Sequence, residues 1–216
     1  MLFDFAKTPP EQRYKLLVGL VTPRPIALVS TRGRDGVVNA APFSFFNVFS
    51  EDPALVVLGI ERRQGVTRKD TAANIEATGE FVVNLVDEAL AERMNLCAVD
   101  FPPEESELAA AGLTPTPMRL VACLGVAEAP AALECRHWRT IAVANGRELV
   151  IGEVVAARMR DDLVDPETLR IDHAALRPIG RLAGDGYCRT RDTFQLTRPS
   201  LESLREARAL AAKGSP

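Results

Sequence analysis

Residues 26–50 read IALVSTRGRDGVVNAAPFSFFNVFS, and this stretch decides the fold. Its first part, Ile26 to Thr31, is rich in residues that favour strands, and it stops shortly before the pair Asp35-Gly36. An Asp-Gly pair between two apolar runs is a strong hairpin signal, because glycine accepts the positive φ of a tight turn. The residues from Val37 to Ser50 then continue as one long extended stretch. We therefore expect an antiparallel hairpin near the start of the sheet.

The rest of the chain is mostly β with short helices. Asn145-Gly146 is a second strong hairpin signal. Six or seven strands with two hairpins favour an antiparallel barrel over a parallel sheet, because closure removes exposed strand edges. The other expected strands are 54–60, 81–86, 121–127, 133–143 and 148–159, and the expected helices are 70–78, 87–98, 104–111 and 199–213.

Composition predicts an ordinary globular protein. The 216 residues are 47% hydrophobic and 25% charged, which is typical of one domain with a sizeable core, and we treat 1–216 as a single domain. The net charge of −3 lacks the basic excess of nucleic-acid-binding proteins. No apolar stretch approaches the roughly 20 residues of a membrane span, and no secretory signal is visible. The spacing of the four cysteines predicts buried, reduced thiols. We expect a cytoplasmic protein.

Several common catalytic motifs are missing from the sequence. It contains no dinucleotide-binding or P-loop glycine pattern, no zinc-protease H-E-x-x-H motif and no G-x-S-x-G nucleophile elbow. Its two histidines, His137 and His173, are too few for a histidine-based metal site. We therefore assign neither a metal site nor a catalytic residue.

A basic segment directly before the helix 70–78 is a candidate phosphate site. The N-terminus of a helix offers free N–H donors and a favourable dipole to anions. Lys69 would add a positive charge and Thr71 a hydroxyl donor, while Asp70 is placed to cap the helix. The alternative is a solvated basic turn in which Asp70 does no more than cap the helix.

The stretch Asn39 to Ser50 is unusual for a strand, because aromatic and small polar residues alternate irregularly around Pro42. Proline in a strand implies an edge or a bulge, where backbone groups are free to bind a ligand. Ser44 and Asn47 would then bond a polar ligand while the phenylalanines form an apolar bed. The alternative is that the phenylalanines are core residues and the polar residues face water.

At these residues the chain resembles the flavin reductase-like family of FMN-binding split barrels, and in particular the reductase components of two-component monooxygenases. The likeness runs in order from about Tyr14 to Tyr187. One departure is Ala183-Gly184, where the family often has two glycines. The matching stretches are TPRPIALVST (22–31), NAAPFSFFN (39–47), KDT (69–71) with Asn74-Ile75, and GEFVVN (79–84).

This resemblance implies an antiparallel split β-barrel that forms a homodimer, with FMN bound at the subunit interface. Ser44, Phe45, Phe46 and Asn47 would line the flavin and its ribityl chain. Lys69, Asp70 and Thr71 would flank the phosphate. Arg24 is a further candidate that would contact flavin, nicotinamide or a neighbouring carboxylate.

The implied activity is reduction of flavin by NADH or NADPH, with reduced flavin or electrons passed to a partner oxygenase or another acceptor. A flavin reductase needs little acid–base chemistry from the protein, because the cofactor itself accepts hydride. One alternative is a non-catalytic FMN-binding electron carrier reduced by a protein partner. Another is a flavin-free barrel with a structural or ligand-binding role.

Overall fold

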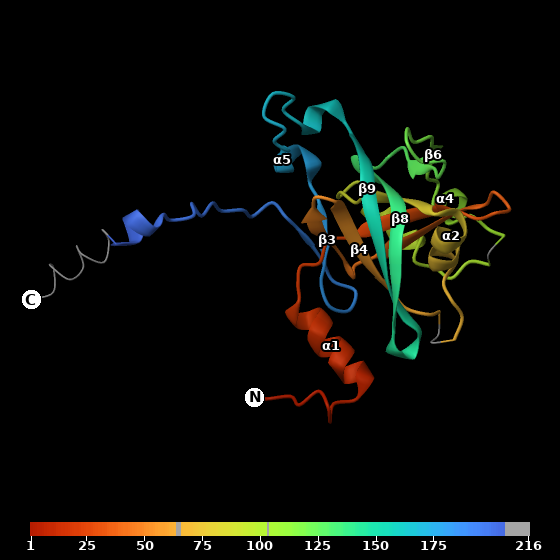
Figure 1. The fold of residues 1–216 in the computed structure, drawn as a ribbon, viewed down its shortest axis with the longest axis horizontal. Coiled ribbons are helices and arrows are strands. Elements are labelled where there is room, and N and C mark those ends of the chain that lie inside the picture. The colour runs from red at the N-terminus through yellow and green to blue at the C-terminus, as the bar shows by residue number, and fades with distance from the viewer. Residues whose placement is uncertain (64–65, 103, 206–216) are drawn as a thin grey trace, which may run out of the picture.

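The computed structural model describes residues 1–63, 66–102 and 104–205. A seven-stranded antiparallel sheet dominates it, and its two longest strands form the hairpin that runs down the middle of Figure 1. Its strands are β1 (Ala27–Arg32), β2 (Val38–Phe43), β3 (Phe46–Glu51), β4 (Ala54–Ile60), β5 (Glu80–Leu85), β8 (Ala131–Val143) and β9 (Arg147–Met159), in the order β2-β1-β5-β8-β9-β4-β3.

The sheet closes at the connection between β2 and β3. These strands follow each other in sequence yet form the two outer positions of the strand order. Only Ser44 and Phe45 join them, so the sheet must curl until its edges meet. The Gly59 N–H of β4 donates to the Phe45 carbonyl at 2.7 Å, and a Cβ on Gly59 would lie 3.0 Å from that of Phe45. The predicted barrel is confirmed. The prediction of one extended stretch over 37–50 is wrong, because the chain turns at this corner and passes from one outer strand of the sheet, β2, to the other, β3.

The predicted turns form as expected. Gly36 adopts φ 90°, and in the second hairpin Asn145 and Gly146 adopt φ 62° and 71°. Within the sheet β2 pairs only with β1, so Pro42 lies on an edge strand, where its missing N–H leaves no gap in the ladder.

The helices are short and lie around the barrel (Figure 1). The first helix was missed by the sequence analysis, because only Val18 of its residues is buried and it has little apolar periodicity. Of the predicted C-terminal helix, 201–205 is helical and 206–213 lies outside the described residues. No helix in the described ranges is both long and apolar enough to span a membrane. The helices are α1 (Pro10–Leu20), α2 (Asp70–Thr78), α3 (Ala91–Leu96), α4 (Glu107–Ala110) and α5 (His173–Leu176).

The predicted strand 121–127 is wrong except at its end, where β7 (Gly125–Val126) pairs with β6 (Pro115–Thr116). Before β7 the chain forms a loop held by the buried carboxylate of Glu134. That carboxylate accepts hydrogen bonds from the N–H groups of Arg119, Leu120 and Val121 at 3.1, 2.5 and 3.1 Å. These amides bond a side chain, so a further strand pairing is not needed to satisfy them.

The core has two main parts. One fills the barrel around Phe81, where Gly152 is required because a Cβ there would lie 2.2 Å from the Phe81 ring. The other packs α3 and α4 against the outside of the barrel, with Leu28 and Met94 fully buried. All four cysteines are free, and all except Cys188 are buried, in line with the predicted reduced thiols. A last hairpin, β10 (Ile179–Arg181) and β11 (Tyr187–Arg189), is bridged at Arg181 to Arg24 and leads into the C-terminal segment.

Candidate functional site

An open cavity of about 370 Å³ lies at the closing corner of the barrel. This volume is within the range of about 300–1,000 Å³ that is usual for small-molecule sites. Its walls are mainly apolar, and the corner residues Ser44, Phe45, Phe46 and Asn47 all contribute to them. The remaining lining residues are Leu17, Val21, Pro23, Arg24, Pro25, Phe49, Val57, Gly59 and Leu149.

The apolar part of this cavity suits a planar aromatic ligand. Phe45 is 46% exposed and Phe49 is 68% exposed, so these rings line the mouth of the cavity and do not fill the core. Phe46 is half-buried and packs against the barrel interior. Of the two sequence alternatives, the core position therefore applies to Phe46, while Phe45 and Phe49 line the cavity and their contact with a ligand stays a prediction.

Two polar side chains of the corner keep hydrogen-bonding capacity. The Ser44 hydroxyl accepts from Arg24 Nε at 3.3 Å, which leaves its own proton free to donate. Asn47 is exposed, and its Oδ1 accepts from the Val48 N–H at 2.8 Å, so its amide nitrogen can donate elsewhere. The corner thus offers an apolar bed with donors at its edge.

Arg24 connects four segments of the chain. Its guanidinium donates to the Val18 and Val21 carbonyls at the end of α1, at 2.7 and 2.9 Å, and to the Leu182 carbonyl at 3.0 Å. The residue is 8% exposed, and no carboxylate in the described ranges forms an ion pair with it. Of the three predicted contacts for Arg24, the neighbouring carboxylate is wrong: helix-end carbonyls with their negative dipole take its place.

A second, smaller cavity of about 210 Å³ adjoins the first and shares Arg24 and Ser44 with it. In its wall the Arg181 guanidinium lies 4.5 Å from the centre of the Tyr187 ring. The Tyr187 hydroxyl donates to Asn95 Oδ1 at 3.2 Å. This cavity is more polar and has cationic groups at its edge.

Lys69 lies at the start of α2, and its side chain reaches the end of β2. Its Nζ is 5.6 Å from the centre of the Phe43 ring, and Phe43 directly precedes Ser44. Gly79 ends the helix with φ 76°, as predicted. Lys69, not Asp70, is the N-cap residue, and no side chain caps the helix. The predicted cap by Asp70 is therefore wrong, and within the described part of the chain no side chain accepts a hydrogen bond from the first N–H groups of α2.

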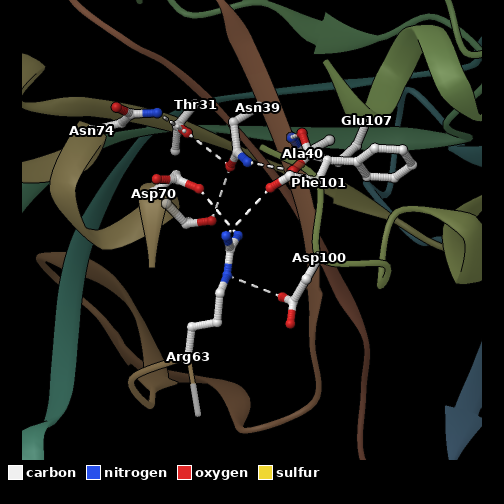
Figure 2. A network of polar contacts seen from close by, with 10 residues as sticks. Thr31, Asn39, Ala40, Arg63, Asp70, Asn74, Asp100, Phe101 and Glu107 are labelled. Carbon is white, nitrogen blue, oxygen red and sulfur yellow. Dashed lines mark hydrogen bonds and ion pairs between the residues drawn. The ribbon is translucent and has the colours of Figure 1, made fainter. Parts of the chain in front are cut away.

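Asp70 instead pairs with Arg63. The Asp70 Oδ2 and Arg63 Nη2 atoms are 3.2 Å apart, and Arg63 also lies 3.1 Å from Asp100 and donates to the Phe101 carbonyl (Figure 2). The ion pair offsets the negative charge that Asp70 would otherwise present to an anion at the helix start.

Thr71 belongs to a buried polar network. Its hydroxyl donates to Asn39 Oδ1 at 3.0 Å, and Asn39 Nδ2 donates to Glu107 Oε1 at 2.7 Å. The other Glu107 oxygen accepts from the Ala40 N–H at 3.0 Å (Figure 2). The Thr71 side chain is 1% exposed, so it anchors α2 to β2, and its backbone N–H remains at the helix start.

Glu107 is the buried carboxyl group of this network, and its surroundings shift its pKa. Burial raises the pKa of its carboxyl group above the ordinary value, although the hydrogen bond from the Ala40 N–H works in the opposite direction. Sequence reasoning did not select Glu107, since an acidic residue in a short helix carries no signal of burial.

Other cavity residues were also missed by the sequence analysis. Leu17 comes from α1 and Val21 directly follows it, and Gly59 and Leu149 come from strands that the sequence did not place beside the corner. Neither histidine lines either cavity. Over the described ranges, no three His, Cys, Asp or Glu side chains gather as a metal site would require. The arrangement can hold a flat aromatic ligand and an anionic group, and it offers no acid–base pair.

The chain matches a known domain family and is similar to known proteins over most of its length. Residues 19–180 match the model of the flavin reductase like domain. The protein YwrF of Bacillus subtilis is 41% identical over 204 residues, covering 92% of this chain and 99% of YwrF.

Two solved structures are also similar. The 2-nitrobenzoate 2-nitroreductase NbaA of Pseudomonas fluorescens has a TM-score of 0.86 at 41% identity, covering 93% of this chain and 98% of NbaA. Nitrilotriacetate monooxygenase component B from Bacillus cereus has a TM-score of 0.86 at 35% identity, covering 91% and 98%. As the sequence resemblance predicted, the chain belongs to the flavin reductase-like family and has its split-barrel fold.

Proposed function

We propose that the protein is a cytoplasmic NAD(P)H-dependent flavin reductase that binds FMN at the closing corner of the barrel. The observation that carries the proposal is the cavity itself, with an apolar bed of phenylalanine rings and the donors Ser44 and Asn47 at its edge. An isoalloxazine ring is flat, largely apolar and has polar atoms along one edge, so this cavity fits it. When bound, the flavin supplies the hydride-accepting chemistry.

The start of α2 supports FMN as the flavin. Its uncapped N–H groups and the Lys69 ammonium group suit a single terminal phosphate. The Asp70 carboxylate is held by Arg63, and Thr71 fixes the helix against β2. In this proposal, Lys69 and the α2 backbone bind the phosphate, while Asp70 and Thr71 position them. Arg24 positions Ser44 and the end of α1.

The surroundings of the cavity support a homodimer. The cavity is open, and the apolar side chains around it are well exposed, among them Val21 at 60% and Phe49 at 68%. Covering such a rim removes apolar surface from water. A second copy would complete the site, and the adjoining polar cavity leaves room for the nicotinamide donor beside the flavin.

Reduced flavin or its electrons would then pass to an acceptor. Similarity to a monooxygenase component supports a partner oxygenase, and similarity to a nitroreductase makes a small nitroaromatic a second acceptor to test.

The test starts from protein purified without added flavin. We expect a visible flavin spectrum, or its appearance after FMN is added, and anaerobic bleaching by NADH or NADPH. Flavin binding without reduction by either nucleotide would favour the electron carrier. No flavin binding would leave a flavin-free barrel.

A further inference from the structure

The C-terminal arm, defined here as residues 192–205, leaves the barrel on the side where α1 and β3 lie (Figure 1). Its root is fixed to the body of the protein. The Thr190 hydroxyl donates to the Pro178 carbonyl at 2.8 Å, and Arg191 Nε donates to Glu88 Oε1 at 2.7 Å. Arg189 binds the same carboxylate, with 3.3 Å between its Nε and Glu88 Oε2. The direction of the arm is therefore set by contacts with the body.

Beyond this root, the described residues of the arm form no hydrogen bond with the body of the protein. Every hydrogen bond of the described residues 192–205 joins two residues of the arm itself. Phe194 is 82% exposed and Leu196 is 84% exposed, so two large apolar side chains are exposed to water on a segment without helix or strand. If this segment is extended when bound, the two side chains point to the same face, because they are two residues apart.

A complementary surface lies on the body of the same protein. We call it the α1–β3 face, and define it by the exposed side chains of Leu17 and Leu20 on α1, of Val21 directly after α1, and of Val48 and Phe49 on β3. Exposed apolar patches of this kind mark interaction sites. Leu17, Val21 and Phe49 also line the large cavity, so whatever covers this face also covers the mouth of the cavity.

We propose that the arm of one copy packs on the α1–β3 face of a second copy, with Phe194 and Leu196 as its anchors. The arm and the face occur in one chain and lie on one side of it, so a two-fold axis there makes the exchange reciprocal. The eight residues 192–199, fully extended, span about 26 Å, which is enough to cross onto a neighbouring barrel. A second copy carries both the arm and the α1–β3 face, so one partner of the same kind covers both surfaces.

The cavity is thus closed by a segment of the partner copy. This part of the inference rests on the proposed flavin site, whereas the arm exchange itself does not. The arm contributes contact area and excludes water from the rim, and it brings no group that takes part in hydride transfer.

Photo-crosslinking tests the exchange directly. The full chain carries p-benzoylphenylalanine in place of Phe194, and ¹⁴N- and ¹⁵N-labelled chains are mixed and reassociated before irradiation. We expect covalent dimers whose mixed-isotope peptides join the arm to residues 10–21 or 46–51. The same photoreactive residue in place of Leu169, which is 75% exposed in a loop outside the α1–β3 face, is the control and should give no such product. Crosslinks within one chain, dimers without arm crosslinks, or a monomeric protein would each overturn the proposal.

A second measurement addresses the anchors. Phe194→Ser with Leu196→Ser should raise the dimer dissociation constant at least tenfold in sedimentation experiments, whereas Gln195→Ser, between them, should leave it within about twofold. An unchanged constant in the double variant would contradict the anchoring role. Flavin content is recorded separately by absorbance, so a protein that crosslinks through its arm but binds no flavin would refute the proposed function and leave the arm exchange standing.

Discussion

The closing corner follows the C-terminal end of β2 and the polar network behind α2 includes Asn39 of the same strand, yet the two regions differ in how far the chain satisfies its own polar groups. In the network, Asn39, Thr71 and Glu107 are buried, and both oxygens of the carboxylate accept hydrogen bonds. At the corner, Phe45 and Phe49 are exposed and the Ser44 proton is unused. The network is complete within one chain, and the corner is not. Function is therefore expected where the chain leaves groups unsatisfied, and stability where it satisfies them.

Replacing Arg24, which ties the closing corner to the end of α1 and to Leu182, should have the largest effect. Arg24→Ala removes a charged donor from three buried or half-buried carbonyls and from Ser44, and should lower the free energy of unfolding by about 3 kcal/mol or more. Urea unfolding measures this. Arg24→Lys keeps the charge but lacks the planar fork, so it should recover only part of the loss. A loss below about 1 kcal/mol would mean that Arg24 does not hold the corner together.

Lys69 tests the part of the site that binds the phosphate. Lys69→Ala removes one charged hydrogen bond, worth roughly 1.5–3 kcal/mol, so FMN affinity should fall at least tenfold. Riboflavin lacks the phosphate and should bind almost as before. The control Lys7→Ala changes an exposed lysine paired with Asp4 and should affect neither ligand. Equal weakening of both flavins would place Lys69 away from the phosphate.

Glu107 tests the satisfied region through its pH dependence. Because its folded pKa is raised, the folded state binds the proton more tightly, and its contribution to stability is lost as pH rises from about the ordinary value of 4.5 through the folded value. The side chain in Glu107→Gln cannot titrate, and its NH₂ group would face the donor of Asn39 or Ala40. The substitution should therefore lower the free energy of unfolding by roughly 1–3 kcal/mol. The stability gap between wild type and variant should narrow as pH rises.

Unfolding curves between pH 5 and 8 measure that gap, with the exposed Glu105→Gln as the control. A gap that stays constant or widens with pH would show that the carboxyl group is charged throughout the folded range.

The smallest effect is expected at the histidines. His137 contacts the Thr140 hydroxyl at 2.8 Å, His173 is exposed, and neither lines a cavity. His137→Gln and His173→Gln should leave anaerobic flavin reduction within about tenfold of wild type. General acid–base catalysis contributes roughly 10²–10⁴-fold, so a loss of that size with flavin binding intact would reveal a proton transfer by the protein.

The sequence predicted the parts of the molecule that depend on local chemistry. Asp35-Gly36, Asn145-Gly146 and Gly79 form the expected turns, since their backbone preferences need no distant partner. The corner 44–47 could be selected because its irregular pattern and Pro42 disfavour an ordinary central strand.

The sequence could not predict contacts set by the closure of the sheet. The contributions of Gly59 and Leu149 to the cavity follow from strand register, and the role of Arg24 follows from carbonyls on α1 and beyond β10. Carbonyl groups are present at every residue, so no sequence pattern distinguishes the ones that receive a buried arginine.

The pairing of β4 with β9 also bears on the order of folding. Gly59 faces Leu149 in this ladder and both line the cavity, so two cavity walls come from segments that lie far apart along the chain. Contacts of such long sequence separation close late, because loop entropy must be overcome before they form. A ligand that needs both walls cannot bind earlier intermediates. FMN should therefore slow unfolding of the finished barrel and leave its rate of folding nearly unchanged.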